Sequence, residues 1–255
     1  MKTELQELIR QLEEATGYKA VVSSVSDIET YSQIISAGPN NPVHLIRINS
    51  KYSQFGDYTA AIQIIMTIFK WKDPENIPDF GVLNEKVKYL SSKLANRNRP
   101  QKFPLGAWEG FVSSLITSLL QQLHSTPFEL MAISYCREQF PGFNSLQEQC
   151  VENQLRENIK ALSPQIQEFA PKDIFDKNAS MNAAFALHWS RITEDNSFLL
   201  PYKAMGFFDM GSDLYKIYNK LVDFSQPQVA IVAIVNAWAE FLSLKTMYTW
   251  SYRKG

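Results

Sequence analysis

Residues 57–71, DYTAAIQIIMTIFKW, decide the fold of the N-terminal half of this chain. Apolar side chains fill most of this stretch, and only Gln63 and Thr67 interrupt its middle. A helix that is apolar on nearly all sides is buried inside a domain rather than laid on its surface. We therefore expect a central helix here, with the neighbouring elements packed around it.

The residues before this helix predict a small α+β unit. Residues 5–12 place Leu and Ile at the i, i+3, i+4 and i+7 spacing of an amphipathic helix. Residues 18–24 and 44–49 are short, β-branched stretches typical of strands, and the glycine and prolines of 38–42 form a turn between them. Strands and helices together make this part α+β.

From residue 104 onward the sequence predicts an almost wholly helical region, with the last helix over residues 228–252. In residues 126–129, Thr, Pro and Glu stand at the N-cap, first and third positions expected of a helix start. Residues 96–104, NRNRPQKFP, are a candidate linker. We predict a predominantly helical α+β protein, with residues 1–100 as the small α+β unit and 101–255 as the helical region, either separate or in one continuous domain.

Composition excludes several classes of protein. The 255 residues carry 25 Lys and Arg against 26 Asp and Glu, which argues against a nucleic-acid binder that uses its whole surface. Two cysteines exclude a disulfide scaffold and indicate a reducing compartment. The N-terminus lacks the apolar core of a signal peptide, and the most apolar stretch, residues 229–244, is shorter than the roughly 20 residues that a bilayer requires. We expect a cytoplasmic protein that does not engage a membrane.

No complete catalytic or cofactor motif is present. His44, His124 and His188 are isolated from one another, and none has a companion ligand at metal-site spacing. Cys136 and Cys150 lack the CxxC spacing of a redox pair, and there is no GxSxG or glycine-rich phosphate loop. We predict no metal and no cofactor.

One pattern resembles a known family. The strand over 44–49, a short polar loop and the helix that starts DYTAAIQ are similar to the core of zinc metallopeptidases of the ImmA/IrrE type. Residues 126–130, TPFEL, are similar to a helix start found in relatives of that group. The resemblance implies a zincin-like N-terminal unit, in which a helix reads approximately [FY]-x-x-A-H-E-x-G-H.

Laid on this chain, that pattern puts its two zinc-binding histidines at Ile62 and Met66 and its glutamate at Gln63. None of these residues replaces the lost chemistry, because an aliphatic side chain and a thioether do not hold a catalytic zinc and an amide does not accept a proton. The resemblance therefore implies a degenerate site filled with core side chains. Our favoured hypothesis is a pseudo-enzyme that acts by binding another protein.

Two alternatives stay open. The first is a hydrolase with an unrecognised site, for which His44, His188 and either Glu109 or Glu129 are the first candidates. It would require two of them to meet in a polar pocket with perturbed pKa values. The second is a nucleic-acid-associated regulator, or more generally a binder of an anionic partner, that uses a basic run composed of Lys86, Lys88, Lys93, Arg97, Arg99 and Lys102.

Overall fold

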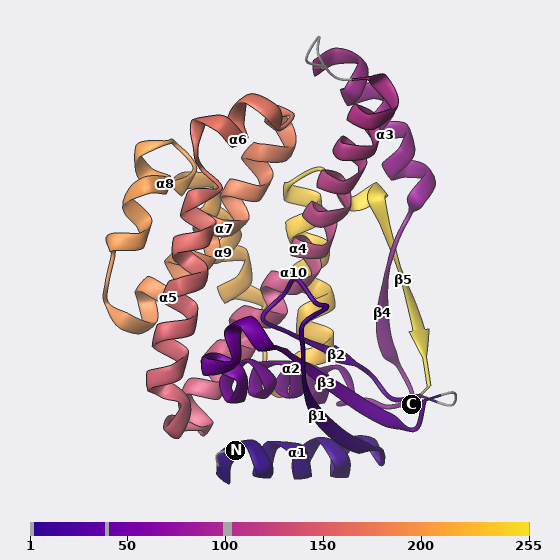
Figure 1. Ribbon diagram of the computed structural model, residues 1–255, viewed down its shortest axis with the longest axis vertical. Helices are drawn as coiled ribbons and strands as arrows, with labels where there is room; N and C mark the ends of the chain where they lie inside the picture. Colours follow the sequence, from indigo (N-terminus) through magenta and orange to yellow (C-terminus); the bar gives the residue numbers. More distant parts are fainter. Residues whose placement is uncertain (1–2, 39–40, 99–103, 255) are drawn as a thin grey trace.

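The computed structural model describes residues 3–38, 41–98 and 104–254. Their fold is α+β and predominantly helical, as the sequence predicts (Figure 1). The helices are α1 (Thr3–Thr16), α2 (Gly56–Lys70), α3 (Asn84–Asn98), α4 (Leu105–Gln139), α5 (Asn144–Lys160), α6 (Pro164–Phe169), α7 (Lys172–Thr193), α8 (Leu200–Ala204), α9 (Phe208–Leu221) and α10 (Pro227–Phe241). The strands are β1 (Lys19–Val25), β2 (Ser32–Ile35), β3 (Val43–Asn49), β4 (Ile77–Val82) and β5 (Tyr248–Arg253).

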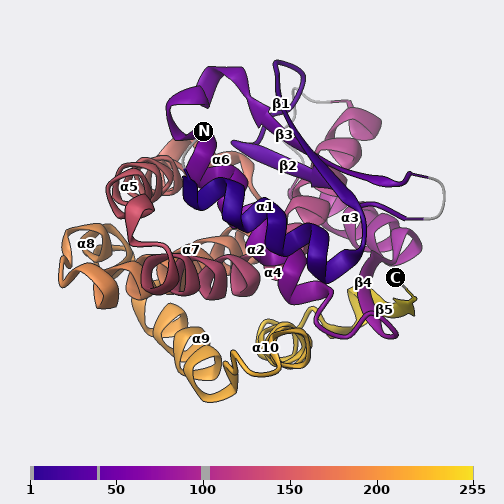
Figure 2. The same cartoon turned by 90° about the horizontal axis from the view of Figure 1, so that it is seen from below.

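The N-terminal sheet has one covered face. Its strand order is β1-β3-β2, with β1 parallel and β2 antiparallel to the central strand β3. Helix α2 packs on β2 and β3, and α1 packs on β1 and on α2, as Figure 2 shows from below. Val21 and Ile35 are exposed on strands β1 and β2. The strand β2 forms one free edge of this sheet.

Helix α2 is the central helix that the sequence predicts. Its alanines and most of its isoleucines are buried, and it contacts α1, the sheet, α4 and α10. At its start, Gly56 passes so close to β3 that an added Cβ would lie 3.2 Å from the Ile48 side chain. The absence of a side chain at Gly56 therefore sets how closely α2 approaches the sheet.

The helical region packs around α4, which runs through the middle of the molecule in Figure 1 and contacts α2, α3, α5, α7 and α10. Residues 179–190 of α7 are buried throughout. Strand β4 pairs in antiparallel fashion with β5, which joins residues 77–82 to residues 248–253. Residues of 1–100 and of 101–255 belong to a single hydrophobic core cluster.

The expected helix start at residues 126–129 is wrong. Pro127 lies inside the continuous helix α4, although a proline in a helix interior removes one hydrogen bond and costs about 3 kcal/mol. Thr126, Pro127 and Phe128 are buried, and Phe128 is fully enclosed. Burial of an aromatic side chain contributes a comparable free energy in the opposite direction, so tertiary packing outweighs the local signal.

The predicted last helix is too long. It ends at Phe241, and a residue in the left-handed region, Ser243 (φ 58°), follows. The alternating aromatic residues of 248–253 form β5 instead, because β4 offers a partner strand for them. The apolar stretch 229–244 thus falls in the 15-residue α10 and the turn behind it. Within the described part of the chain, no helix combines the length and apolar composition needed to cross a membrane.

Candidate functional site

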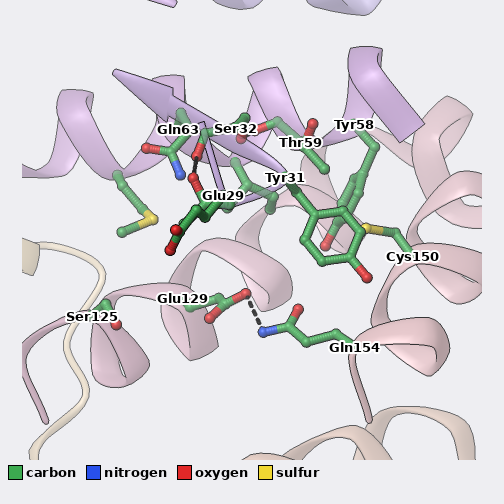
Figure 3. Close-up of a pocket in the computed structure, with 13 residues that line it drawn as sticks. Glu29, Tyr31, Ser32, Tyr58, Thr59, Gln63, Ser125, Glu129, Cys150 and Gln154 are labelled. Atoms are coloured by element: carbon green, nitrogen blue, oxygen red, sulfur yellow. Dashed lines mark hydrogen bonds between the residues drawn. The ribbon is translucent and has the colours of Figure 1, made fainter. Parts of the chain in front are cut away.

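The face of α2 that carries Ile62, Gln63 and Met66 lines a cavity of about 410 Å³, which we call the α2 cavity. The opposite wall comes from α4 and α5, and the start of β2 with the residues before it closes one side. Figure 3 shows Gln63 and Glu29 on one side of this space and Glu129 with Gln154 on the other. The degenerate positions therefore border a cavity, and Ile62 also belongs to the hydrophobic core cluster, with Met66 packed against it.

Glu129 is the ionisable group in this cavity whose pKa is shifted toward neutral pH. It lies on α4, and one carboxyl oxygen accepts a hydrogen bond of 3.0 Å from the Gln154 side-chain amide of α5. Burial raises the pKa of Glu129 from 4.5 to about 7, and the bond from Gln154 offsets only part of that effect. Glu129 therefore exchanges a proton near neutral pH.

The nearby groups that could serve as nucleophiles are not activated. Burial raises the pKa of the Cys150 thiol to about 12, so that it stays protonated at neutral pH. Burial also raises the pKa of Tyr58 well above its ordinary value. Both side chains line the α2 cavity as neutral groups.

A second space, the edge cavity, opens along β2. It has a volume of about 450 Å³ and shares Glu29, Thr30, Ser32 and Gln63 with the α2 cavity. Ser32 and Ile34 lie opposite Ile48 and Ile46 of β3, while the neighbouring Tyr31 carbonyl bonds to the Asn49 N–H. Because hydrogen-bonded and non-bonded pairs alternate in an antiparallel ladder, the backbone groups of Ser32 and Ile34 point away from β3.

A third space, the amide cavity, has a volume of about 410 Å³ and lies between α4, α5 and α7. It shares Thr30, Ser125, Glu129 and Gln154 with the α2 cavity. Six carboxamide side chains line it, those of Gln121, Gln122, Gln154, Asn158, Asn178 and Asn182. The α2 cavity shares lining residues with each of the other two cavities, and we call these three adjoining spaces the cleft. Glu129 borders two of them.

Sequence reasoning missed the amide cavity. Its signal was present as amide residues at i, i+4 spacing in two helices, Gln154 with Asn158 and Asn178 with Asn182. This spacing places both members of each pair on one helix face. The pattern is easily overlooked because uncharged polar residues are common on ordinary solvated helix faces.

His44 has a structural role. Its Nδ1 accepts a bond of 3.1 Å from the Ala37 N–H, so the ring is neutral and carries its proton on Nε2. Nε2 lies 2.9 Å from Thr16 Oγ1, whose own proton goes to the Leu12 carbonyl. Burial lowers the pKa of His44. The ring thus ties β3 to the end of α1 and has no capacity left for a ligand.

The other two histidines lie in separate packed environments. His124 stacks on Phe80 at 4.7 Å between ring centroids, and burial lowers its pKa to about 3. His188 Nε2 lies 3.1 Å from Ser134 Oγ, and burial lowers the pKa of this histidine to about 4. Neither histidine lines any of the three cavities.

The two glutamates of the hydrolase hypothesis lie in different places. Glu129 lines the cleft, whereas Glu109 accepts a hydrogen bond from Ser92 in the contact between α4 and α3. The hydrolase hypothesis requires two of its four candidates, the two histidines and the two glutamates, in one pocket. Among the described residues, Glu129 is the one candidate that lines the cleft.

The basic run lies in part on α3. Lys86, Lys88, Lys93 and Arg97 are exposed there, and Arg99 and Lys102 lie outside the described residues. Helical spacing puts residues 86, 93 and 97 on one face, with residue 88 about 200° away from residue 86. The four described charges therefore do not form a single patch, and an anionic partner for them stays a prediction.

No family model, curated protein or solved structure matches this chain. No three His, Cys, Asp or Glu side chains of the described residues come together as metal ligands could. Ile62, Gln63 and Met66 do not fit the zinc that the family resemblance implies. What the cleft offers is a free strand edge, a proton-exchanging carboxyl and a wall of carboxamides.

Proposed function

We propose that this protein is a non-catalytic, metallopeptidase-like binding protein that holds an extended segment of a partner protein in the cleft. The observation that carries the proposal is the free edge of β2, which opens into the same cleft as Ile62, Gln63 and Met66. The resemblance of this chain to ImmA/IrrE-type metallopeptidases supports the same function, because the positions of the lost zinc ligands and glutamate, Ile62, Gln63 and Met66, border the cleft without holding zinc.

The physical basis is strand addition. The outward N–H groups of Ser32 and Ile34 and the Ile34 C=O can pair with an added strand, which supplies affinity that does not depend on sequence. The Ser32 C=O already accepts a hydrogen bond of 3.0 Å from Thr30 Oγ1. Alternate side chains of such a segment would face the cavities, which supply specificity. Gln63 and Glu29 lie next to the path on one side and Glu129 on the other.

A selection from a library of short random peptides on the immobilised full chain tests the proposal. We expect peptides that bind wild type and lose about tenfold or more in affinity on Met66→Trp, because the indole would occupy the α2 cavity. Ile34→Pro removes an outward N–H that the ladder with β3 does not use, and it should weaken the same peptides. Fluorescence anisotropy with labelled peptides measures both.

The matched control is Met205→Trp, since Met205 is a partly exposed methionine between α8 and α9, outside the cleft. It should leave peptide affinity unchanged. Circular dichroism of each variant separates a lost site from a lost fold. The proposal fails if no peptide binds above background, or if folded Met66→Trp and Ile34→Pro bind the selected peptides as well as wild type does.

Catalysis by Glu129 is the second candidate, favoured by one observation. A carboxyl with a pKa of about 7 in a cleft is poised for general acid–base work. Incubating the selected peptides with wild type and with Glu129→Gln distinguishes the two candidates. Cleavage products that form with wild type and vanish with Glu129→Gln would favour a hydrolase, whereas intact peptides in both would favour binding.

The partner and the compartment follow from the same features. Cys136 and Cys150 are free, buried thiols, which suits a reducing environment. We therefore propose a cytoplasmic location, with another protein as the partner.

A further inference from the structure

The amide cavity contains a closed ring of hydrogen bonds. Asn178 Nδ2 donates to Gln122 Oε1 at 2.7 Å, and Gln122 Nε2 donates to Asn182 Oδ1 at 2.7 Å. Asn182 Nδ2 then donates back to Asn178 Oδ1 at 3.2 Å, so that three side chains from α4 and α7 each give one bond and receive one. The ring fixes the orientation of all three amides.

This ring leaves half of its hydrogen-bonding capacity unused. A carboxamide has two N–H groups and an oxygen with two lone pairs, and the ring consumes one N–H and one lone pair of each. The three amides therefore keep three donors and three acceptors, and all three side chains line the cavity. Asn182 is only 6% exposed, so a ligand in the cavity would meet its polar atoms with little competition from bulk water.

The remaining lining disfavours an anionic ligand. Lys, Arg and His are absent from the cavity's described lining, so an anion would meet no opposite charge. Ser118, Ser125 and Thr126 add hydroxyls, and Glu129 is the one carboxyl. Phe185 is the one aromatic side chain of this lining and is 3% exposed, so it offers no ring face on which a sugar could stack.

A carboxamide on the ligand fits these constraints best. It matches the ring amides in shape and in its pairing of donor with acceptor, so that two parallel hydrogen bonds can form with one of them. A carboxylate of the same shape would bring a charge and lose both donors. An aliphatic side chain of the same length would leave the buried amides unpaired.

We infer that the amide cavity is a specificity subsite for an uncharged carboxamide, supplied by a Gln or Asn side chain of the segment bound along β2. This inference rests on the proposed function for the segment, but the subsite is defined by the ring of Gln122, Asn178 and Asn182 alone. Glu129, at the junction with the α2 cavity, marks the point where the segment passes from the strand edge into the subsite.

Small probes test the subsite without the strand edge. N-acetylglutamine methylamide is titrated into the ¹⁵N-labelled full chain while the side-chain NH₂ signals of the ring amides are followed by NMR. We expect saturable shifts of these signals, with the glutamate and norleucine analogues weaker by about tenfold or more because they leave buried amides mispaired. Asn182→Leu should abolish the response.

Asn158→Ala is the second variant, since Asn158 lines the cavity outside the ring and its loss leaves the ring bonds intact. It should weaken the glutamine probe without changing the fold, whereas Asn219→Ala, on the exposed side of α9, should have no effect. Equal binding of the glutamine and glutamate probes would overturn the inference. NH₂ signals of the ring that respond to none of the three probes would overturn it too. A response to maltose in their place would assign the cavity to a carbohydrate.

The probe result is separable from the proposed function. Shifts with the glutamine probe, together with a failure to select any peptide, would keep the subsite and remove the segment along β2. Peptides that bind at β2 but neither contain Gln or Asn nor perturb the ring would keep the proposed function and remove the subsite.

Discussion

Two polar clusters join α4 to α7, and one of them lines the amide cavity. Gln122, Asn178 and Asn182 line the amide cavity, whereas Ser134 and His188 form a pair enclosed by Tyr215 and Tyr218. The sealed pair has the residue types that catalytic motifs use, a hydroxyl beside an imidazole. The open cluster has residue types that no catalytic motif requires.

A polar cluster can be a binding or catalytic site only where a ligand can reach it. Burial lowers the pKa of His188 to about 4, but the described residues around it leave none of the three cavities within its reach. Glu129 has an equally displaced pKa and borders two cavities. A shifted pKa indicates function only in combination with a space that a ligand can enter.

The largest expected effect is a gain of metal binding in the open region. The variant Ile62→His, Gln63→Glu and Met66→His would place two imidazoles one helical turn apart on the wall of the α2 cavity, with Glu129 on the opposite wall. We expect stoichiometric zinc in this variant by mass spectrometry of metal content, and none in wild type. Adding Glu129→Gln should weaken the retained zinc if the carboxyl is its third protein ligand.

A folded triple variant without zinc would contradict the zincin-like geometry of α2. It would leave the cleft and the amide ring in place, because neither depends on the family resemblance.

The second effect separates the two clusters by stability. His188→Ala should lower the free energy of unfolding by about 3–4 kcal/mol, because it empties a packed site and removes the hydrogen bond between Ser134 and His188. Asn178→Ala should cost about 1 kcal/mol, because water in the cavity can replace the lost bonds. Urea denaturation measures both. Equal losses would show that the amide ring is a packing contact like the sealed pair and would remove the contrast between them.

Much of the fold was predictable because its signals are local. Residues 57–71 predicted the buried α2 correctly, and residues 18–24 and 44–49 predicted β1 and β3. The errors came where a distant partner decided the structure. Pro127 lies inside α4 because the core encloses its neighbours, and residues 248–253 form a strand because β4 pairs with them.

The site was predictable in one of its walls. The positions of Ile62, Gln63 and Met66 were identified through a resemblance, and all three line the cleft. The opposite wall brings together α4, α5 and α7, and only tertiary packing could place Gln154 beside Glu129 or Asn182 beside Gln122. Carboxamides carry no charge or motif that would single them out before the helices are assembled.

The third effect is an opposite dependence of stability on pH. Glu129 has a raised pKa in the folded state, so the folded protein holds the proton more tightly and stability falls as pH rises from about 4.5 to 7. His188 has a lowered pKa, so the unfolded protein holds the proton more tightly and stability rises as pH rises from about 4 to 6.5. Each shift corresponds to at most roughly 3.5 kcal/mol.

Variants isolate the two contributions. Glu129→Gln should gain stability relative to wild type at about pH 8 but not at about pH 4, and His188→Gln should lose more at the higher pH than at the lower. A Glu129→Gln difference that does not change with pH would show that Glu129 has the same pKa in the folded and the unfolded protein, contrary to the effect of its burial.

The smallest effect concerns the two thiols, of which Cys150 lines a cavity and Cys136 does not. Burial raises the pKa of both Cys136 and Cys150 to about 12, so both should react slowly with iodoacetamide near neutral pH. Cys150 lines the α2 cavity and Cys136 is fully buried, so Cys150 should be alkylated a few-fold faster, about the difference expected from access alone. Peptide mass spectrometry over time measures both rates.

Met66→Trp should slow the alkylation of Cys150 and leave that of Cys136 unchanged, because the indole would fill the space through which the reagent arrives. Equal rates in wild type would mean that both thiols react only through opening of the whole fold, and that the cavity beside Cys150 does not admit even a small reagent.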